Sequence, residues 1–150
     1  MKTSPIPLPG TAFLVAWIAQ MRLARGRGVT FGSALAATPA LLGASWLGLG
    51  SLAQFRARQT SYSPVTLDRA HALVEEGPNA VTRNPMYVAL ALLLAAHATA
   101  RRSLAAALPV AAFVAVVDRF QIPAEEAALA ERFGGSYRRH RARVPRWWGL

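Results

Sequence analysis

Four stretches that carry almost no charged residues limit what this 150-residue chain can fold into. They run over residues 5–21, 29–54, 84–100 and 103–117. A helix needs about 20 apolar residues to cross a bilayer, and only the stretch 29–54 comfortably exceeds that length. Charged residues make up 16% of the chain, against about 25% in soluble domains, so we favour an integral membrane protein. A soluble bundle with the shorter stretches as core helices is the alternative.

The four stretches predict an all-α, polytopic protein with about four transmembrane or membrane-embedded helices. We expect the helices at residues 11–21, 31–53, 85–100 and 104–117. The polar segment 54–83 is expected to form a cytoplasmic loop. The polar residues from Asp118 to Pro123 are expected to end the fourth helix. A short cytoplasmic helix then runs to Phe133, where Gly134-Gly135 stops it.

Residues 48–53, GLGSLA, match the glycine pattern of nucleotide-binding loops. That pattern needs a preceding strand and opens a helix, whereas here it lies inside a predicted apolar helix. Small residues also let two membrane helices approach closely. We therefore interpret these glycines as a helix-packing surface.

The distribution of arginine and lysine predicts the orientation in the membrane. If both termini and the polar loop share one side, that side holds twelve of these residues and the other side holds five. The positive-inside rule then places the loop and the C-terminal helix in the cytoplasm. Arg22, Arg25 and Arg27 fit poorly, which leaves open whether residues 11–21 span fully. The alanine- and arginine-rich composition is typical of a GC-rich bacterium, so we expect the inner membrane.

The composition disfavours several kinds of site. The chain has no cysteine, which excludes a disulfide, a thiolate nucleophile and cysteine-ligated zinc. His71, His97 and His140 have no metal-ligand spacing, so no metal is expected. His97 lies in an apolar helix and is expected to bond to another helix. We attribute the net charge of +10 to topology and anionic headgroups rather than to nucleic-acid binding.

Arg83, Asn84 and Tyr87 crowd into the sequence RNPMY, where the polar loop meets the third apolar stretch. A structural interpretation accounts for them: Asn84-Pro85 is a good helix start, Arg83 can reach headgroups and Tyr87 can lie in an aromatic belt. The functional interpretation rests on spacing. Residues three and four apart share one face of a helix, so a guanidinium, an amide and a phenol would converge at the membrane surface.

Glu125 and Glu126 form a second polar cluster, after the predicted helical hairpin. Acidic residues stabilise the first turn of a helix, and this structural role alone would account for the presence of both glutamates. Adjacent helical residues point about 100° apart, so we do not expect a paired acid–base dyad. We expect the hairpin to bring these glutamates to the same side as RNPMY, where the two clusters form one site.

The two clusters together carry a resemblance to a known family. The stretch LVEEGPNAVTRNPMYVAL, then a helical hairpin, then EEAALAERFGGSYRRHRARVPRW, resembles the isoprenylcysteine carboxyl methyltransferase and phospholipid methyltransferase superfamily. The matching positions are Leu73, Val74, Gly77, Pro78, Arg83, Asn84, Pro85, Met86 and Tyr87, followed by Glu125, Glu126, Leu129, Phe133, Gly134, Tyr137, Val144 and Pro145. We expect residues 1–150 to form one domain, with anchor helices in 1–55 and the cofactor site in 65–147.

The resemblance implies an integral membrane enzyme that transfers a methyl group from S-adenosylmethionine to a lipophilic or small acceptor. The residues implied in the cofactor pocket are Asn84, Pro85, Tyr87, Glu125 and Tyr137. Those implied at the border of the reacting centre are Arg83, Glu126 and Arg143. An arginine there would hold an acceptor carboxylate or phosphate, or Glu126 would take a proton from an amine or thiol. The implied partners are membrane lipids and a membrane-partitioned substrate.

The chain departs from the family pattern at Asn79 and Ala80, where members have Tyr-Arg, and at Ala89, which replaces a common glycine. We interpret this as altered acceptor choice, with an inactive relative as the alternative. A non-catalytic four-helix membrane protein, such as a lipid-binding adaptor or small exporter, is a further alternative. An exporter normally carries an embedded ionisable coupling residue, and the predicted spans hold only His97 centrally. The acceptor is open among isoprenylcysteine, phospholipid amine, quinone-like and small thiol compounds.

Overall fold

The computed structural model describes residues 8–57 and 75–148, and every element within these ranges is helical. This confirms the all-α prediction. Most of the predicted polar loop, with Leu73 and Val74 of the family pattern, lies outside the described residues. The elements are α1 (Leu8–Leu23), α2 (Phe31–Ala57), α3 (Pro78–Val81), α4 (Pro85–Ala100), α5 (Ala107–Val116), the π-helical turn η2 (Val117–Gln121) and α6 (Ile122–Arg143).

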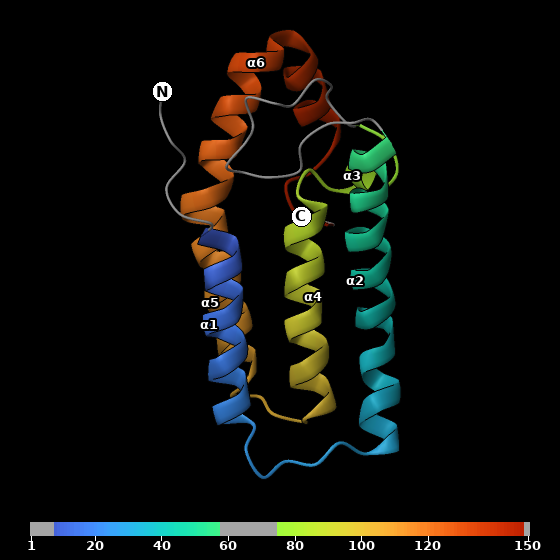
Figure 1. Ribbon diagram of the computed structural model, residues 1–150, viewed down its shortest axis with the longest axis vertical. Coiled ribbons are helices and arrows are strands. Elements are labelled where there is room, and N and C mark those ends of the chain that lie inside the picture. Colours follow the sequence, from blue (N-terminus) through green and yellow to red (C-terminus); the bar gives the residue numbers. More distant parts are fainter. Residues whose placement is uncertain (1–7, 58–74, 149–150) are drawn as a thin grey trace.

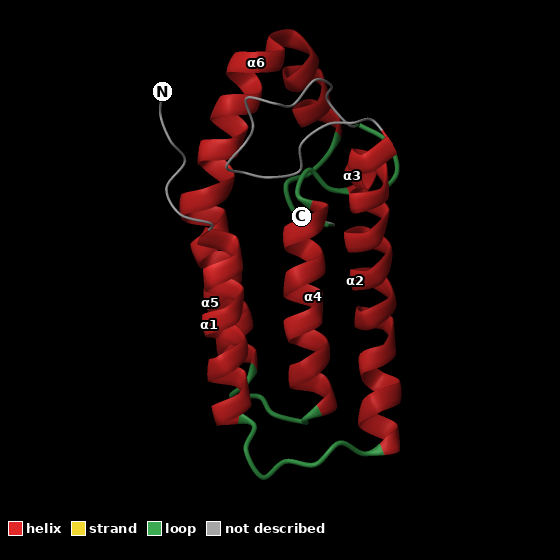
Figure 2. Cartoon of the chain, viewed as in Figure 1, coloured by secondary structure: helices red, strands yellow, loops and turns green. Residues whose placement is uncertain are grey.

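The long helices run side by side between two ends of the molecule (Figure 1). α4 lies in the middle, with α2 on one side and the α1–α5 pair on the other. The α1–α2 and α4–α5 connections both lie at one end, which we call the turn end, and α3 and α6 lie at the other, the polar end (Figure 2). α4 also begins at the polar end. RNPMY and the paired glutamates therefore share one end of the bundle, as the sequence predicts.

Small residues let α2 pack closely on its neighbours. A Cβ added to Gly48 would lie 3.5 Å from the Cβ of Ala89 on α4, and one added to Gly50 would lie only 2.9 Å from Cγ of Pro78 on α3. Real Cβ contacts are not that short, so α3 could not approach α2 if residue 50 carried a side chain. The interpretation of GLGSLA as a packing surface is confirmed.

The helices expose apolar surface along their lengths. Phe31–Gln54 and Ala107–Arg143 are long and apolar enough to cross a bilayer, and Pro85–Ala100 is a shorter apolar helix. Large apolar side chains point outward on α1, α2 and α5, among them Leu14, Val15, Ile18, Leu35, Leu42, Trp46, Leu49 and Leu108. An outward-facing apolar surface of this kind is suited to lipid rather than water. The molecule is an all-α membrane protein.

The prediction that Asp118 to Pro123 ends the fourth helix is wrong. α5 continues through η2 into α6 without a break. Proline inside an α-helix loses a hydrogen bond and clashes with the preceding turn, and a widened π turn is one way that helices accommodate such a site. Here η2 ends two residues before Pro123, so the proline follows a turn that is already widened.

The helix that begins at Ile122 stops at Gly134, as the sequence predicts, but a second helical stretch follows that the sequence does not predict. Gly134 does leave the helical conformation, with φ of 48° and ψ of −116°, but the chain resumes its helix and continues to Arg143. Gly134 is therefore a kink between the two helical stretches of α6. A positive φ is readily adopted by glycine, which has no Cβ, and it turns residues 135–143 back across the polar end (Figure 1).

A buried polar contact joins α1 to α4 near the turn end. Gln20 of α1 is fully buried, and its Nε2 donates to the main-chain oxygens of Leu94 at 2.9 Å and Ala106 at 2.8 Å. Its Oε1 lies 3.1 Å from Nδ1 of His97. The prediction that His97 bonds to another helix is confirmed.

Candidate functional site at the polar end

Asn84 begins α4 but does not cap it. Its side chain makes no hydrogen bond to the first turn, and Nδ2 instead donates to the main-chain oxygen of Arg146 at 3.1 Å. The hydroxyl of Thr82 donates to the same oxygen at 2.8 Å. The start of α4 therefore binds the segment that follows α6, in addition to opening its own helix.

A main-chain hydrogen bond strengthens this attachment. The amide of Arg83 donates to the carbonyl oxygen of Pro145 at 2.9 Å. Val144, the residue that ends α6, is buried and extended. Because α6 is kinked at Gly134, the residues after it reach back to the start of α4. Two stretches 60 residues apart in the chain are thus held together by main-chain contacts.

An ion-pair cluster lies beside this attachment. Arg83 Nη1 donates to Glu126 Oε1 at 2.7 Å, and both side chains are only 10% exposed. Arg146 donates to both oxygens of Glu126, from Nε at 3.2 Å and from Nη2 at 2.8 Å. Arg146 Nη1 and the indole of Trp147 donate to Asp118 Oδ1 at 3.2 and 2.8 Å. Two guanidinium groups therefore hold one buried carboxylate, which strengthens each hydrogen bond.

The neighbouring glutamate has a separate set of partners. The phenol of Tyr87 donates to Glu125 Oε1 at 2.5 Å, and Gln121 Nε2 donates to the same oxygen at 2.7 Å. Glu125 and Glu126 thus bind different groups, as their positions on the helix predict. Tyr87 lies in the first turn of α4, so the RNPMY stretch contacts both glutamates.

Tyr137 lies beside the ion-pair cluster, on the part of α6 that follows Gly134. This part carries four arginines between residues 138 and 143, and such a density of charge places it outside the apolar spans. Tyr137 is only 2% exposed. Burial raises the pKa of its phenol, and the negative charge of Glu126 raises it further, against an opposing effect of Arg83. The phenol therefore stays protonated at neutral pH.

Arg143 lies outside the ion-pair cluster. Its side chain is 66% exposed, and its Nη2 lies 3.4 Å from Oε2 of Glu75. His140, one turn earlier, is buried, with Nδ1 at 3.7 Å from Oε1 of the same glutamate. Burial lowers the pKa of His140, and the guanidinium groups of Arg83 and Arg143 lower it further, while Glu75 opposes this shift. These residues form an outer rim of the polar end.

The structure brings together most of the residues that the sequence predicts for the site. Arg83, Tyr87, Glu125 and Glu126 are in direct contact. Arg143 is not part of this group.

Sequence reasoning missed Arg146, which occupies the position beside Glu126, and also Asp118 and Gln121. The signal available for Arg146 was its place in VPRW, directly after the Val-Pro of the family pattern. Hydrogen bonds to Glu126 and Asp118 raise the pKa of Arg146, so it remains a cation.

Several buried polar side-chain atoms at the polar end have no hydrogen-bond partner among the residues that the structure describes. Two of them, Nε of Arg83 and Nδ2 of Asn79, are donors on the short stretch leading into α4. An unpaired buried donor costs about 1–3 kcal/mol. Such groups favour a ligand that offers oxygen or nitrogen acceptors.

The chain was compared with known proteins. A family model described as phospholipid methyltransferase matches residues 33–136. An uncharacterized protein of Haemophilus influenzae is 40% identical over 62 residues, which is 41% of this chain and 98% of the relative. No solved structure matches. The family match extends from α2 through the first part of α6 and includes both Arg83 and Glu126. This protein belongs to the phospholipid methyltransferase family.

Proposed function

We propose that this protein is an S-adenosylmethionine-dependent methyltransferase that acts on a lipophilic or membrane-partitioned acceptor at its polar end. The observation that carries the proposal is the 2.7 Å contact between Arg83 Nη1 and Glu126 Oε1. It joins the RNPMY stretch to the paired glutamates, and the family supplies the class of reaction.

The groups at the polar end fit S-adenosylmethionine. The cofactor carries a carboxylate, ribose hydroxyls and purine nitrogens, all of which accept hydrogen bonds, and Arg83 Nε and Asn79 Nδ2 are buried donors. The residues that we assign to the cofactor are Asn84, through its Oδ1, with Pro85, Tyr87, Glu125 and Tyr137. When bound, the cofactor supplies a methyl group on a positively charged sulfur.

Arg83 is the residue that we assign to the acceptor. Its Nη1 is held by Glu126, so the guanidinium is fixed in orientation, while its Nε, unpaired among the described residues, remains to bind an acceptor. A fixed guanidinium suits a carboxylate or phosphate oxygen, which it can bind with two parallel hydrogen bonds. Methyl transfer is an in-line displacement, so accurate positioning of the attacking atom contributes much of the rate.

Glu126 acts on the acceptor indirectly, by positioning the guanidinium of Arg83. Both of its oxygens already accept hydrogen bonds from guanidinium groups, so its first role is to position Arg83. For an amine or thiol acceptor, Glu126 takes a proton only after one of these contacts opens. An acceptor that attacks through an anionic oxygen of a carboxylate or phosphate needs no such step, so these contacts favour an acceptor of that kind.

Charge supports an orientation with the polar end in the cytoplasm. Exposed arginines crowd the second half of α6, including Arg143 at the rim. A basic rim of this kind attracts anionic headgroups, and the positive-inside rule assigns this end to the cytoplasmic face of a bacterial inner membrane. We assign Arg143 to the approach of the acceptor.

Incubation of the purified protein in lipid nanodiscs tests the proposal. We expect methyl-labelled S-adenosylmethionine and a bacterial lipid extract to give a labelled lipophilic product, which mass spectrometry identifies. Arg83→Ala should reduce transfer by about 100-fold or more, the effect of removing one fixed donor from a reacting centre. The variant should still insert and fold, because Arg146 continues to pair with Glu126.

Arg138→Ala is the matched control, because Arg138 is exposed on α6 and forms no part of the cluster. It should transfer methyl groups at the rate of the unaltered protein. Normal turnover in Arg83→Ala would rule out its assigned role. Calorimetry with S-adenosylmethionine distinguishes the methyltransferase from a non-catalytic lipid-binding adaptor, because the adaptor would bind no cofactor.

A further inference from the structure

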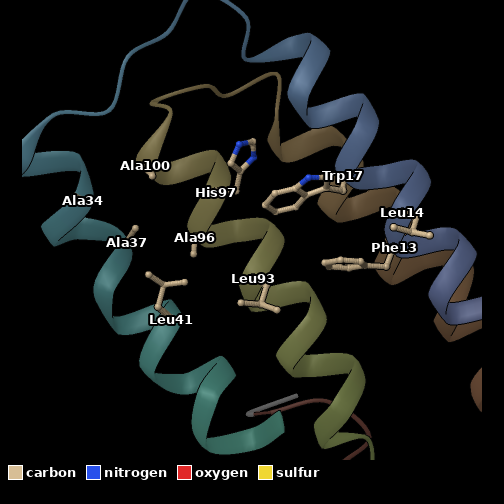
Figure 3. Close-up of a pocket in the computed structure, with 10 residues that line it drawn as sticks. All are labelled: Phe13, Leu14, Trp17, Ala34, Ala37, Leu41, Leu93, Ala96, His97 and Ala100. Atoms are coloured by element: carbon tan, nitrogen blue, oxygen red, sulfur yellow. The ribbon is translucent and has the colours of Figure 1, made fainter. Parts of the chain in front are cut away.

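A cavity of about 520 Å³ lies between α1, α2 and α4, toward the turn end (Figure 3). Its walls include Phe13 and Trp17 of α1, Leu41 of α2 and Leu93 of α4, and the imidazole of His97 is also part of the lining. Leu41 is 45% exposed, which places it at the mouth of the cavity on the outer surface of the bundle. The cavity therefore opens sideways, toward lipid.

This cavity is separate from the polar end. Tyr87 and His97 both lie on α4, ten residues apart, which corresponds to about 15 Å along the helix. The cluster around Glu126 lies beyond Tyr87 at the opposite end of the bundle. A ligand whose polar end lies at His97 therefore has that end far from the site proposed for methyl transfer.

Hydrogen bonds fix the tautomer of His97. Gln20 Nε2 donates to two main-chain oxygens, those of Leu94 and Ala106, so its Oε1 is left as an acceptor. His97 Nδ1, at 3.1 Å, must then donate to Oε1. Ionised side chains are costly in an apolar membrane site, and a neutral imidazole with a proton on Nδ1 has a lone pair on Nε2. His97 Nε2 is thus a hydrogen-bond acceptor.

The position of the ring is also fixed. The indole of Trp17 lies against it, with 4.7 Å between ring centroids and 35° between planes, and Gln20 is fully buried. Within residues 8–57 and 75–148, His97 Nε2 has no hydrogen-bond partner from a side chain or the main chain. Because Nε2 is an acceptor in an apolar cavity, a ligand that donates a hydrogen bond to it is favoured over a ligand that is only a hydrocarbon chain.

We propose that this cavity binds a lipophilic molecule whose end group, a hydroxyl or an N–H, donates a hydrogen bond to Nε2 of His97. The apolar part of the ligand lies against Phe13, Leu41 and Leu93. The ligand is defined by complementarity: the walls exclude a charged group, and the fixed acceptor selects a donor. This second site is independent of the proposed methyl transfer, and its occupancy requires no cofactor.

Dodecan-1-ol and its methyl ether are suitable probes, because they share an apolar chain and differ in the donor. We expect the alcohol to bind roughly fivefold to tenfold more tightly than the ether at equal concentration in nanodiscs, the effect of one net hydrogen bond. Nitrogen-15 NMR of histidine-labelled protein should show the Nε2 signal of His97 shifting with the alcohol and not with the ether. Equal affinities, or an unmoved Nε2 signal, would overturn the proposal.

Two variants separate the parts of the proposal. His97→Phe removes the acceptor, so alcohol and ether should bind equally. Leu41→Trp fills the mouth of the cavity without touching the Gln20–His97 contact, so both probes should bind weakly while the nitrogen-15 signal of His97 stays at its ligand-free position. Alcohol binding by Leu41→Trp at the strength of the unaltered protein would show that the alcohol binds elsewhere, and the proposal would be wrong.

Discussion

Arg146 binds Glu126 with two guanidinium nitrogens, Nε on one carboxylate oxygen at 3.2 Å and Nη2 on the other at 2.8 Å. The same guanidinium reaches Asp118 with Nη1 at 3.2 Å. Arg146 therefore connects the start of α6 to the turn η2 that precedes it, while its main-chain oxygen is held by Thr82 and Asn84.

Arg146→Ala should lower both stability and methyl transfer. The change leaves Asp118 and the 10% exposed Glu126 with fewer donors, and lost hydrogen bonds to charged groups cost roughly 2 kcal/mol. Arg143→Ala should change the free energy of unfolding by no more than about 0.5 kcal/mol, because Arg143 is mostly exposed. Unfolding in detergent micelles measures the free energy of unfolding of both variants. Equal stabilities would contradict a structural role for the Arg146 cluster.

Gly50→Ala should destabilise the contact of α2 with α3. The new Cβ would lie 2.9 Å from Cγ of Pro78, and forcing a group into a packed contact costs typically 1–3 kcal/mol. The better helix propensity of alanine recovers up to about 1 kcal/mol. Gly32→Ala is the control, because a Cβ there meets nothing within 4 Å. Thermal unfolding should show a loss for the first and no loss for the second.

Gly134→Ala should straighten or strain the kink in α6. A residue with a Cβ is strained at the φ of 48° and ψ of −116° of Gly134, at a cost on the order of 1–3 kcal/mol. The kink also directs Tyr137 to the ion-pair cluster, so methyl transfer should fall as well. Gly135→Ala, whose Cβ would meet Arg139 Nη1 at an ordinary 3.5 Å, should keep both. Full activity of Gly134→Ala would show that the kink is not needed.

His140 should make stability fall in mild acid. Burial holds the pKa of His140 in the folded protein below its ordinary value of about 6.5. As the pH falls through 6.5, the unfolded chain binds a proton first, so the free energy of unfolding decreases until the pH reaches the folded pKa. Above about pH 7.5 the histidine is neutral in both the folded and the unfolded chain, so none of this stability is lost.

The comparison of unaltered protein with His140→Gln, unfolded in detergent between pH 8 and 5.5, isolates this histidine from His71 and His97. The variant should show a shallower loss of stability with falling pH. Identical pH dependence in the two proteins would mean that His140 does not contribute.

The sequence predicted α2, α4 and the convergence of RNPMY with the paired glutamates because each depends on local pattern. An uncharged run of more than 20 residues identifies α2, and Asn84-Pro85 marks the start of α4. A hairpin of two antiparallel helices returns the chain to the side where it began, which placed Glu126 near Arg83. These relationships follow from helix length and the direction of the chain.

The errors concern residues whose conformation depends on distant contacts. Gly134 stops the first helical stretch of α6, as local rules predict, but the chain beyond it forms a second helical stretch, and Tyr137, His140 and Val144 are buried at the polar end. Arg146 follows a proline in an arginine-rich segment, where a solvated side chain is the ordinary expectation. Its contacts with Glu126 and Asp118 depend on the kink, and no local pattern encodes them.

The attachment of Pro145 and Arg146 to the start of α4 has a consequence for biosynthesis. Thr82, Arg83 and Asn84 are translated well before Pro145 and Arg146, so their contacts with these two residues cannot form until the two residues have been made. A growing chain can therefore insert its hairpin while the site is still incomplete. We therefore expect the ion-pair cluster to assemble after the hairpin has inserted, and a chain interrupted before Pro145 to reach the membrane and remain inactive.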